Sequence, residues 1–491
     1  MTSRPFPHHA ETDEDHQHLL VGAEPANNDE LNSEFGGTSQ RKLMERNLLR
    51  KLDSRMSILI IIYILNYIDR NNAAAARLRG FEEDLRLKGK EFDSILSILY
   101  VGYIIMQVPS NMLLNYIGKP SVYLPVCMII WGSISILTGF ATNFFQAFIA
   151  RFFLGFVEAA FFPGALFLLS KWYKRDELGL RTALLFCGSL MSNAFGALLA
   201  SGILNAMEGT FGRAAWRWLF YVEGSLTVFF AIIALFILPD FPSNSMWLSP
   251  LERRLAERRL QEDIGVDDKA THGEEGWISG LTMTFSDWTV WWLALALGMM
   301  VVSLSFNTFF PTLSETMGFN TTITLLLCAP PWLFATVMAF VVARHSDKSG
   351  ERFFHIVGPL VLGILGFLVA ISTMNTAARY VSLFLMAQSY AGFVTFYAWI
   401  SNSIPHPPLK RAIALAFINA FSQLGNVVAA FAWPRTWGPS YAISYEICIA
   451  TSVCAIAMCY LFKRHLIRVN EQLEREEEER GEVRTGFRFL L

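Results

Sequence analysis

Long apolar stretches recur along this chain, and they constrain its fold more than any other feature. One of them runs from Ala141 to Ser170 and is too long and too apolar for an ordinary surface helix. It suits a helix that crosses a bilayer, which needs about 20 apolar residues. Only 17% of the 491 residues are charged, whereas soluble domains average about 25%. We therefore predict an all-α integral membrane protein.

About twelve such spans can be counted along the sequence. They begin near Ser57, Ser94, Ser121, Phe145, Thr182, Trp218, Trp288, Thr322, Phe354, Tyr380, Ala412 and Tyr441. A polar central loop, 241–286, separates six spans from six, which predicts two six-helix bundles over 53–240 and 287–466. Within the loop, LERRLAERRLQEDIGVDD predicts a charged amphipathic helix. We expect a disordered N-terminal tail over 1–52 and a C-terminal tail over 467–491.

The basic residues predict how the protein lies in the membrane. Lys and Arg gather in both tails, in the central loop and in the loops after spans 4, 8 and 10. With an even number of spans these segments share one side, and the positive-inside rule makes that side cytoplasmic. The loop between spans 1 and 2 is also basic, but its acidic residues balance it. We expect a monomeric, multi-pass protein of the plasma membrane, with both termini cytoplasmic and no cleaved signal peptide.

Composition and motifs argue against several classes of function. The net charge of −2 and the lack of a dominant basic surface argue against nucleic acid as a partner. The six cysteines lie in apolar segments without metal-ligand spacing. The sequence has no P-loop, so ATP is not the expected energy source. We expect no cofactor, no metal and no enzymatic activity, and the bilayer as the main surroundings.

Two opposite charges, Arg151 and Glu158, lie inside one apolar span. A charge near the bilayer centre costs about 2.5–3.5 kcal/mol on insertion scales and usually marks a path for substrate or protons. Seven residues are nearly two helical turns, so both side chains share a face. A structural ion pair that locks two helices is the alternative interpretation.

Three further charges are candidates for function. Asp69 and Arg70 lie near mid-depth in span 1, and Glu223 lies in span 6, nearer its outer end. For Glu223, anchoring that end and transferring protons are equally good explanations. No histidine lies inside a span, so protons that drive transport must be carried by a carboxylate. We assign proton coupling to Glu158, Asp69 and Glu223.

The spans of the second half carry neutral polar and aromatic groups instead of charges. The candidates for substrate contact there are Asn307, Tyr390, Tyr397, Asn419 and Gln423. Asn419, Gln423 and Asn426 follow one helical face. Hydrogen bonds between helices would also explain such residues. A cavity of this kind suits a ring or a planar carboxylate held by stacking and amide contacts.

Four segments carry a family resemblance: LNYIDRNNAAAA, RFFLGFVEAAFFPG, WRWLFYVEG and SNSIPHPPLKRAIALAFINAFSQLGN. They resemble the fungal allantoate permease family, the anion:cation symporter branch of the major facilitator superfamily, over about 50–468. The resemblance implies the major facilitator fold. It also implies import of a small organic anion, such as nicotinate, pantothenate, biotin or allantoate, mostly with protons.

More distant cousins, the vesicular glutamate and sialic-acid transporters, use an arginine in the first span and an arginine and a glutamate in the fourth. Arg70, Arg151 and Glu158 match those positions, which implies that both arginines bind the carboxylate. Some cousins add an arginine in span 7, where this chain has Ser303, Ser305, Phe306 and Asn307. This departure favours a monoanion over a dicarboxylate.

The superfamily's loop signature is incomplete after span 2, where NYIGKPSVY has no Asp–Arg pair. Its counterpart after span 8, ARHSDKSGER, is better preserved. By resemblance, Asp347 and Arg352 form a cytoplasmic gate.

The leading hypothesis is a secondary transporter that imports a small organic monoanion with protons by alternating access. An exporter of an organic acid or secondary metabolite is the alternative with the same fold. A membrane enzyme or a nutrient sensor is a third possibility. The sequence shows neither the clustered catalytic constellation of an enzyme nor the large soluble extension of a sensor.

Overall fold

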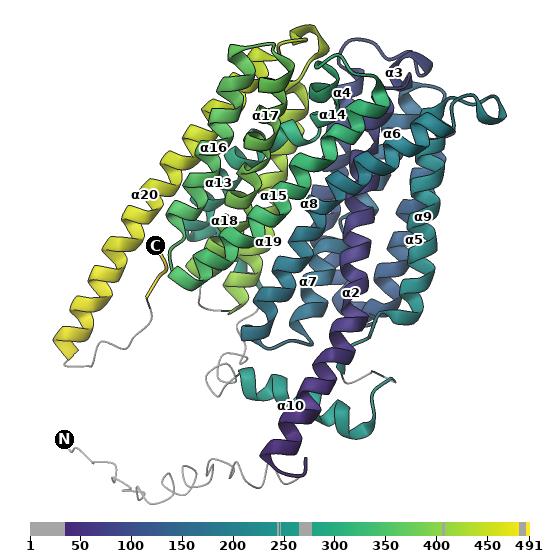
Figure 1. Ribbon diagram of the computed structural model, residues 1–491. Helices are drawn as coiled ribbons and strands as arrows, with labels where there is room; N and C mark the ends of the chain where they lie inside the picture. The colour runs from purple at the N-terminus through teal and green to yellow at the C-terminus, as the bar shows by residue number, and fades with distance from the viewer. Residues whose placement is uncertain (1–34, 243–244, 246, 265–276, 405–407, 481–487) are drawn as a thin grey trace, which may run out of the picture.

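The computed structural model is a bundle of long helices and describes residues 35–242, 245, 247–264, 277–404, 408–480 and 488–491 (Figure 1). The first half of the chain contains α2 (Thr38–Arg77), α3 (Phe81–Asp84), α4 (Glu91–Ile117), α5 (Pro120–Thr138), α6 (Phe144–Glu158), α7 (Phe161–Ser170), α8 (Arg175–Ala206), η1 (Thr210–Gly212) and α9 (Ala215–Ile237). Two helices follow in the central segment, α10 (Pro250–Ile264) and α12 (Trp277–Ser286). The second half contains α13 (Trp288–Ser303), η3 (Leu304–Asn307), α14 (Phe310–Glu315), α15 (Thr321–Ser349), α16 (Phe353–Ser372), α17 (Thr376–Ala387), α18 (Ser389–Ser403), α19 (Pro408–Ala429), η4 (Ala430–Ala432), η5 (Arg435–Trp437) and α20 (Ala442–Arg480).

The membrane-spanning helices match the spans expected from the sequence. Within the described ranges, eleven helices or helix pairs are long and apolar enough to cross a bilayer. The helix pair α6–α7 forms one of them, as does α17–α18. Helix α2 runs the length of the bundle beside them (Figure 1), although Asp69, Arg70 and the neighbouring asparagines lower its mean hydropathy. The predicted all-α membrane fold is therefore confirmed.

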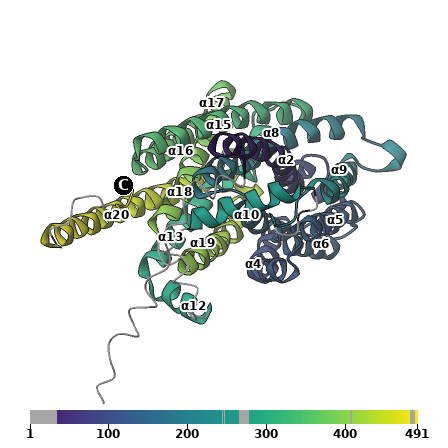
Figure 2. The same ribbon diagram turned by 90° about the horizontal axis from the view of Figure 1, so that it is seen from below.

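The spans pack in two groups, which we call the N-half (α2–α9) and the C-half (α13–α20). In the N-half, α5 packs on α9, α4 on α6, and α2 on both α8 and α9. In the C-half, α13 packs on α19 and α20, and α16 on α17, α18 and α20. The halves meet where α8 contacts α15 and α4 contacts α19. Seen along the bundle, the two groups lie side by side (Figure 2).

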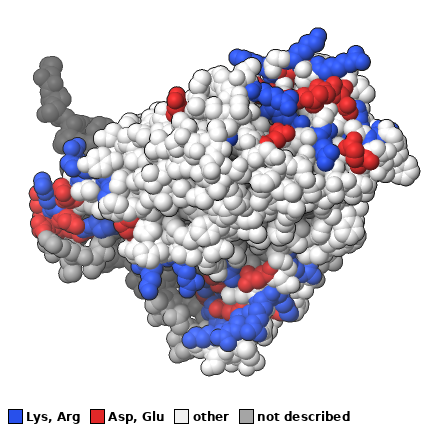
Figure 3. All heavy atoms as spheres, turned by 45° about the horizontal axis from the view of Figure 1, so that its top comes forward, with Lys and Arg blue, Asp and Glu red and all other residues white. Residues whose placement is uncertain are grey.

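Charged side chains avoid the middle of the face that Figure 3 draws. Figure 3 shows Lys, Arg, Asp and Glu gathered toward the ends, with a broad uncharged belt between them. Large apolar residues are exposed along the spans, among them Leu137, Phe236 and Val337. Hydrocarbon is the solvent that such a surface suits, and backbone groups in hydrocarbon must be paired within helices.

The face that carries the N-terminal end of α2, helix α10 and the C-terminal end of α20 is called the tail face below; the other end is the opposite face (Figure 1). Helix α10 is the charged helix expected in the central loop. We expected disorder up to residue 52, but α2 already begins at Thr38. Ion pairs with α10 hold this extension, because Lys51 Nζ lies 2.6 Å from Glu252 Oε1 and Arg41 Nη2 lies 2.5 Å from Glu262 Oε2. Residues 1–34 lie outside the described ranges.

Glycines allow α4 and α6 to approach closely behind the centre of the N-half. A Cβ atom on Gly155 of α6 would collide with the carbonyl oxygen of Leu99 on α4, and one on Gly102 of α4 would collide with that of Phe152. Small residues at such crossings let helix backbones come together in a membrane. This contact fixes the height of α6 and therefore of Arg151 and Glu158.

We expect Gly155→Ala to destabilise the protein by about 1–3 kcal/mol, as overpacking typically does. Thermal unfolding of purified protein in detergent measures the change. Gly358→Ala is the matched control, because a Cβ there meets no atom within 4 Å. Equal unfolding temperatures for both variants would contradict the proposed close crossing.

Candidate functional site

A cavity lies between the two halves, near the middle of the spans. We call it the central cavity. Its lining residues from the N-half include Tyr63, Asn66, Tyr67, Arg70, Asn71, Tyr100, Tyr103, Glu158, Phe162, Phe186, Ser189 and Asn193. Those from the C-half are Val301, Leu304, Asn307, Thr308, Tyr390, Phe393, Tyr397, Asn419, Gln423 and Asn426. Seven predicted site residues therefore meet in one place: Arg70, Glu158, Asn307, Tyr390, Tyr397, Asn419 and Gln423.

The charged centre of this cavity is an ion pair between Arg70 of α2 and Glu158 of α6. Arg70 Nε donates to Glu158 Oε1 at 3.2 Å, and Arg70 Nη2 is also 3.2 Å from that oxygen. Both side chains are largely buried, at 8% and 0% exposure. Among the described residues, the other oxygen, Glu158 Oε2, has no hydrogen-bond partner. One carboxyl oxygen of Glu158 is therefore bonded to Arg70, while the other has no hydrogen-bond partner among the described residues.

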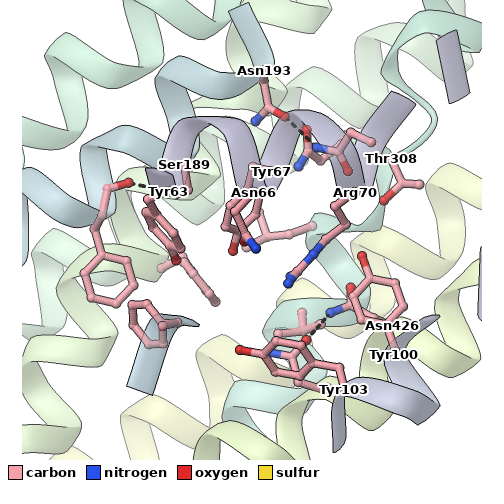
Figure 4. Close-up of a pocket in the computed structure, with 18 of the residues that line it drawn as sticks. Tyr63, Asn66, Tyr67, Arg70, Tyr100, Tyr103, Ser189, Asn193, Thr308 and Asn426 are labelled. Atoms are coloured by element: carbon pink, nitrogen blue, oxygen red, sulfur yellow. Dashed lines mark hydrogen bonds between the residues drawn. The ribbon is translucent and has the colours of Figure 1, made fainter. Parts of the chain in front are cut away.

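Tyrosines surround the Arg70 guanidinium. Its central carbon lies 4.9 Å from the ring centre of Tyr67, 5.0 Å from that of Tyr103 and 5.8 Å from that of Tyr100. Cation–π contacts of this kind stabilise an arginine away from bulk water. Figure 4 shows Arg70 extending from α2 into the open space, with Asn66 beside it and Tyr103 across from it. The cation is thus held in place while facing the cavity.

The C-half contributes a neutral, hydrogen-bonding wall. Tyr397 donates its hydroxyl to Asn419 Oδ1 at 2.8 Å, and Asn426 Nδ2 donates to Gln423 Oε1 at 2.8 Å. The side-chain oxygen of Asn307 is buried and has no partner within the described chain. All described lining residues of this half are uncharged. The wall can stack on a ring and hydrogen-bond polar substituents.

Interruptions of the helices shape this cavity. Span 4 breaks between α6 and α7, directly after Glu158, because Pro163 cannot donate a backbone hydrogen bond to the turn before it. Span 7 unwinds into η3 at Leu304–Asn307, and Pro311 opens the following helix α14. Irregular backbone at membrane depth is tolerated where it lines a cavity. Asn307 is presented by such a segment.

Arg151 does not line the central cavity. Its Nη1 donates to the carbonyl oxygens of Asp69 at 3.2 Å and Arg70 at 3.1 Å, and its Nη2 donates to Asn72 Oδ1 at 2.6 Å. Arg151 is 1% exposed. Arg151 and Glu158 both face α2, as their spacing predicts, but Glu158 meets Arg70 whereas Arg151 supports the backbone behind it. Arg151 is positioned to hold Arg70 and does not face the space that a substrate would fill.

Asp69 points away from the central cavity, into the N-half. Its two carboxyl oxygens accept hydrogen bonds from Ser135 of α5 at 2.8 Å and from Thr227 of α9 at 2.7 Å. The side chain is fully buried. Because both oxygens already have donors, the contacts describe an anchor that joins three helices.

Glu223 of α9 lies apart from Glu158. It is 2% exposed and lines a second cavity, on the side toward the opposite face. We call this the opposite cavity. Other residues that line it include Asn71, Asn72, Ser192, Asn193, Asn307, Thr308, Cys328 and Trp332.

The two residues expected to form a cytoplasmic gate pair with each other at the tail face. Arg352 Nη2 lies 2.7 Å from Asp347 Oδ1, and Arg352 Nη1 donates to Ser346 Oγ at 3.0 Å. Asp347 lies in the last turn of α15 and Arg352 directly precedes α16, so this pair lies within the C-half. Their role in gating stays a prediction.

Several lining residues escaped the sequence-based selection, chiefly Tyr63, Tyr67, Tyr100, Tyr103, Phe162, Phe186, Ser189 and Asn193. A signal for some of them was present. Tyr63, Asn66, Tyr67 and Arg70 repeat at helical spacing, and Ser189 and Asn193 are one turn apart. Aromatic residues in a membrane span are common, so spacing alone did not separate these rings from lipid-facing ones.

The lining of the central cavity offers charged groups, side-chain amides and aromatic rings for ionic, hydrogen-bonding and stacking contacts. Over the described residues, no group of three or more His, Cys, Asp or Glu side chains is placed to hold a metal ion.

Comparison with known proteins places the fold in a family. Residues 59–430 match the family model described as Major Facilitator Superfamily. The chain belongs to the major facilitator superfamily. It is 28% identical over 489 residues to the MFS-type transporter cnsO of Penicillium expansum, covering 94% of this chain and 92% of that protein. It is 30% identical over 400 residues to a putative tartrate transporter of Agrobacterium vitis, covering 78% and 87%.

Solved structures agree on the fold. A bacterial homologue of the human lysosomal transporter Spinster superposes with a TM-score of 0.64 at 17% identity, covering 85% of this chain and 98% of that one. The xylose transporter XylE from E. coli superposes with a TM-score of 0.61 at 16% identity, covering 83% and 99%. The predicted major facilitator fold is therefore confirmed, and the protein is a secondary membrane transporter and not an enzyme.

We expect Asp69→Ala to destabilise the N-half, because the hydroxyls of Ser135 and Thr227 would lose their acceptors. Each buried polar group left unpaired costs about 1–3 kcal/mol. Thermal unfolding in detergent tests this expectation. Ser189→Ala is the control, since Ser189 lines the cavity and donates only within its own helix, to the carbonyl oxygen of Phe186. A stable Asp69→Ala protein that fails only in transport would instead assign Asp69 a direct role.

Proposed function

We propose that this protein imports a small organic monoanion together with a proton, and that it belongs to the allantoate permease branch of the superfamily. One observation carries the proposal: the described lining of the central cavity contains one arginine, Arg70, and one carboxylate, Glu158, bonded to each other. All the other described lining groups are neutral, and many are tyrosines or side-chain amides.

An entering carboxylate competes with Glu158 for the guanidinium of Arg70. Arginine presents its donors in a planar fork that fits a carboxylate, so it is suited to such an exchange. Once the anion holds Arg70, Glu158 loses its partner in a region where an isolated charge is costly. Taking up a proton on Glu158 removes that charge. Anion binding and proton binding then favour each other, as symport requires.

The charge of the cavity limits the substrate to one negative charge. A second carboxylate would have to be buried against the C-half wall, where the described lining residues offer no cation. The Agrobacterium vitis relative is named for tartrate, which is a dicarboxylate. The arrangement here favours a monocarboxylate with a ring or with polar groups that amides can bind, of the type of nicotinate, pantothenate or allantoate.

Contacts between the halves lie on both sides of the cavity. Toward the tail face, the rings of Phe186 and Tyr397 lie 5.3 Å apart. At the opposite face, Arg435 Nη1 lies 2.7 Å from Glu82 Oε2. Alternating access in this fold exposes a fixed site by rocking one half against the other. In our proposal these two contacts break in turn, and Asp347 and Arg352 support the closed state at the tail face.

The proposed orientation places the tail face in the cytoplasm, with both termini there, and the protein in the plasma membrane as a monomer. The basic residues of the N-terminal end of α2 and those of α10 lie at the tail face, which is the distribution that the positive-inside rule associates with the cytoplasm.

Uptake assays test the proposed transport. In yeast lacking its own transporters, we expect uptake of labelled nicotinate, pantothenate or allantoate, with little uptake of short dicarboxylates. Uptake should increase as the external pH is lowered, because the proton enters with the anion. If none of these anions is taken up above background and the cells extrude a metabolite, the result would favour an exporter instead.

Substitutions in the ion pair separate binding from coupling. We expect Arg70→Lys to weaken substrate affinity by about tenfold or more, because lysine keeps the charge but loses the bidentate fork. Glu158→Gln should still bind the anion but should not accumulate it against a gradient. Binding is measured on purified protein, and accumulation under an imposed pH gradient. Undiminished accumulation by Glu158→Gln would exclude this residue as the proton carrier.

A further inference from the structure

The opposite cavity is separated from the central cavity by a small set of shared residues. Asn71, Asn193, Asn307 and Thr308 line both spaces. Asn71 Nδ2 of α2 donates to Asn193 Oδ1 of α8 at 3.0 Å, which closes part of this boundary. Arg70 and Glu158 lie on one side of it and Glu223 lies on the other. The two glutamates therefore belong to different compartments.

Two buried polar atoms of this second compartment lack partners. Glu223 Oε2 and Asn72 Nδ2 have no hydrogen-bond partner within the described residues, and both residues line the opposite cavity. Unpaired buried polar groups are rare and call for an explanation such as a ligand or ordered water. An acceptor and a donor that line the same cavity fit a water molecule that accepts from Asn72 Nδ2 and donates to Glu223 Oε2.

The surroundings of Glu223 distinguish it from a structural anchor such as Asp69. Asp69 is fully bonded by two hydroxyls, whereas Glu223 keeps an unbonded oxygen. The groups that act on Glu223 are Asp69 of α2, the side-chain amide of Asn72 on the same helix, and Arg151 of α6. Helix α8, which also packs against α9, contributes neutral groups to the cavity, Ser192 and Asn193.

A chain of hydrogen bonds connects this compartment with the anion site. Asn72 lines the opposite cavity and accepts from Arg151 Nη2 at 2.6 Å. Arg151 Nη1 donates to the backbone carbonyl of Arg70 at 3.1 Å. The Arg70 side chain then enters the central cavity. A change in charge at Glu223 therefore acts on Arg151 and Asn72, and through them on the residue that holds the anion.

We propose that the opposite cavity is a proton-binding site separate from the anion site, and that Glu223 takes up the proton there from water admitted at the opposite face. A hydronium ion gives its proton to Glu223 Oε2, which leaves a water molecule and a neutral carboxylic acid. Asn72 and Arg151 are the positioning residues that transmit this change to Arg70. This inference rests on the proposed proton symport and adds a second carboxyl that gains a proton, distinct from Glu158 at the anion site.

The test uses full-length protein in proteoliposomes, with whichever of labelled nicotinate, pantothenate and allantoate the wild type takes up best. Three quantities are measured: accumulation driven by an imposed pH gradient, exchange of internal for external anion without a gradient, and anion binding. For Glu223→Gln we expect gradient-driven accumulation to fall by about tenfold or more, within the usual range of coupling between sites. Exchange and anion binding should stay close to the values of the wild type at low pH, because the neutral glutamine imitates the protonated carboxyl, and binding should lose its dependence on pH. Glu446→Gln, an exposed carboxylate on α20, is the matched control.

The outcomes separate this inference from the proposed function. A wild type that ignores the pH gradient would overturn proton symport itself. If the pH gradient drives accumulation equally well in the wild type and in the Glu223→Gln variant, only the role of Glu223 is overturned. Glu223→Asp should restore part of the accumulation, because it keeps an ionisable carboxyl; a hydrogen-bonding role alone would be served by the glutamine.

A second measurement does not depend on how the Glu223 variants fold. Cys328 lines the opposite cavity. In a protein that keeps Cys328 as its only cysteine, a membrane-impermeant thiol reagent should label it from the opposite face during turnover. Labelling from the tail face only, or from neither face, would show that the cavity does not open where the proposal requires.

Discussion

The hydrogen-bonded pair of Arg70 and Glu158 is the interaction on which the rest of this structure depends. Two opposite charges buried between membrane helices are stable only if geometry and additional contacts compensate for the lost water. Three tyrosine rings surround the cation, and Arg151 secures the α2 backbone that carries it. The close crossing of α4 and α6 sets the height of the anion. Neighbouring groups therefore hold the pair in place. In the proposed transport cycle, an incoming carboxylate exchanges partners with it while the surrounding helices stay folded.

The two halves divide the chemistry between them. The described membrane-embedded charges of the centre, on α2, α6 and α9, all belong to the N-half, while the C-half supplies rings and amides. This division has a mechanical consequence. When the halves rock against each other, the ionic contacts move together within one bundle. The contacts that must break near the centre are neutral, such as that between Phe186 and Tyr397, whereas the ionic contact of Arg435 with Glu82 lies at the opposite face.

Much of this fold could be predicted, because hydrocarbon imposes simple rules. Length and hydropathy located the spans, and the family resemblance of four motifs agreed with the superfamily that the comparisons establish. The amide stripe of α19, visible in the sequence as a helical repeat, lines the central cavity in the structure. The helical extension of α2 below the membrane was not foreseen, since its stability comes from ion pairs with α10, a segment about two hundred residues away along the chain.

The sequence by itself determined which residues enter the membrane, that Arg151 and Glu158 share a helix face, and that the second half brings no charge to the centre. Tertiary structure alone decided which of those charges face a cavity. Helical periodicity relates side chains within one helix, but it does not set the height and rotation of that helix against its neighbours. Arg151 and Glu158 lie seven residues apart on α6. Glu158 contacts the side chain of Arg70, whereas Arg151 contacts its backbone carbonyl. Glu158 therefore faces the central cavity, whereas Arg151 supports the helix behind it.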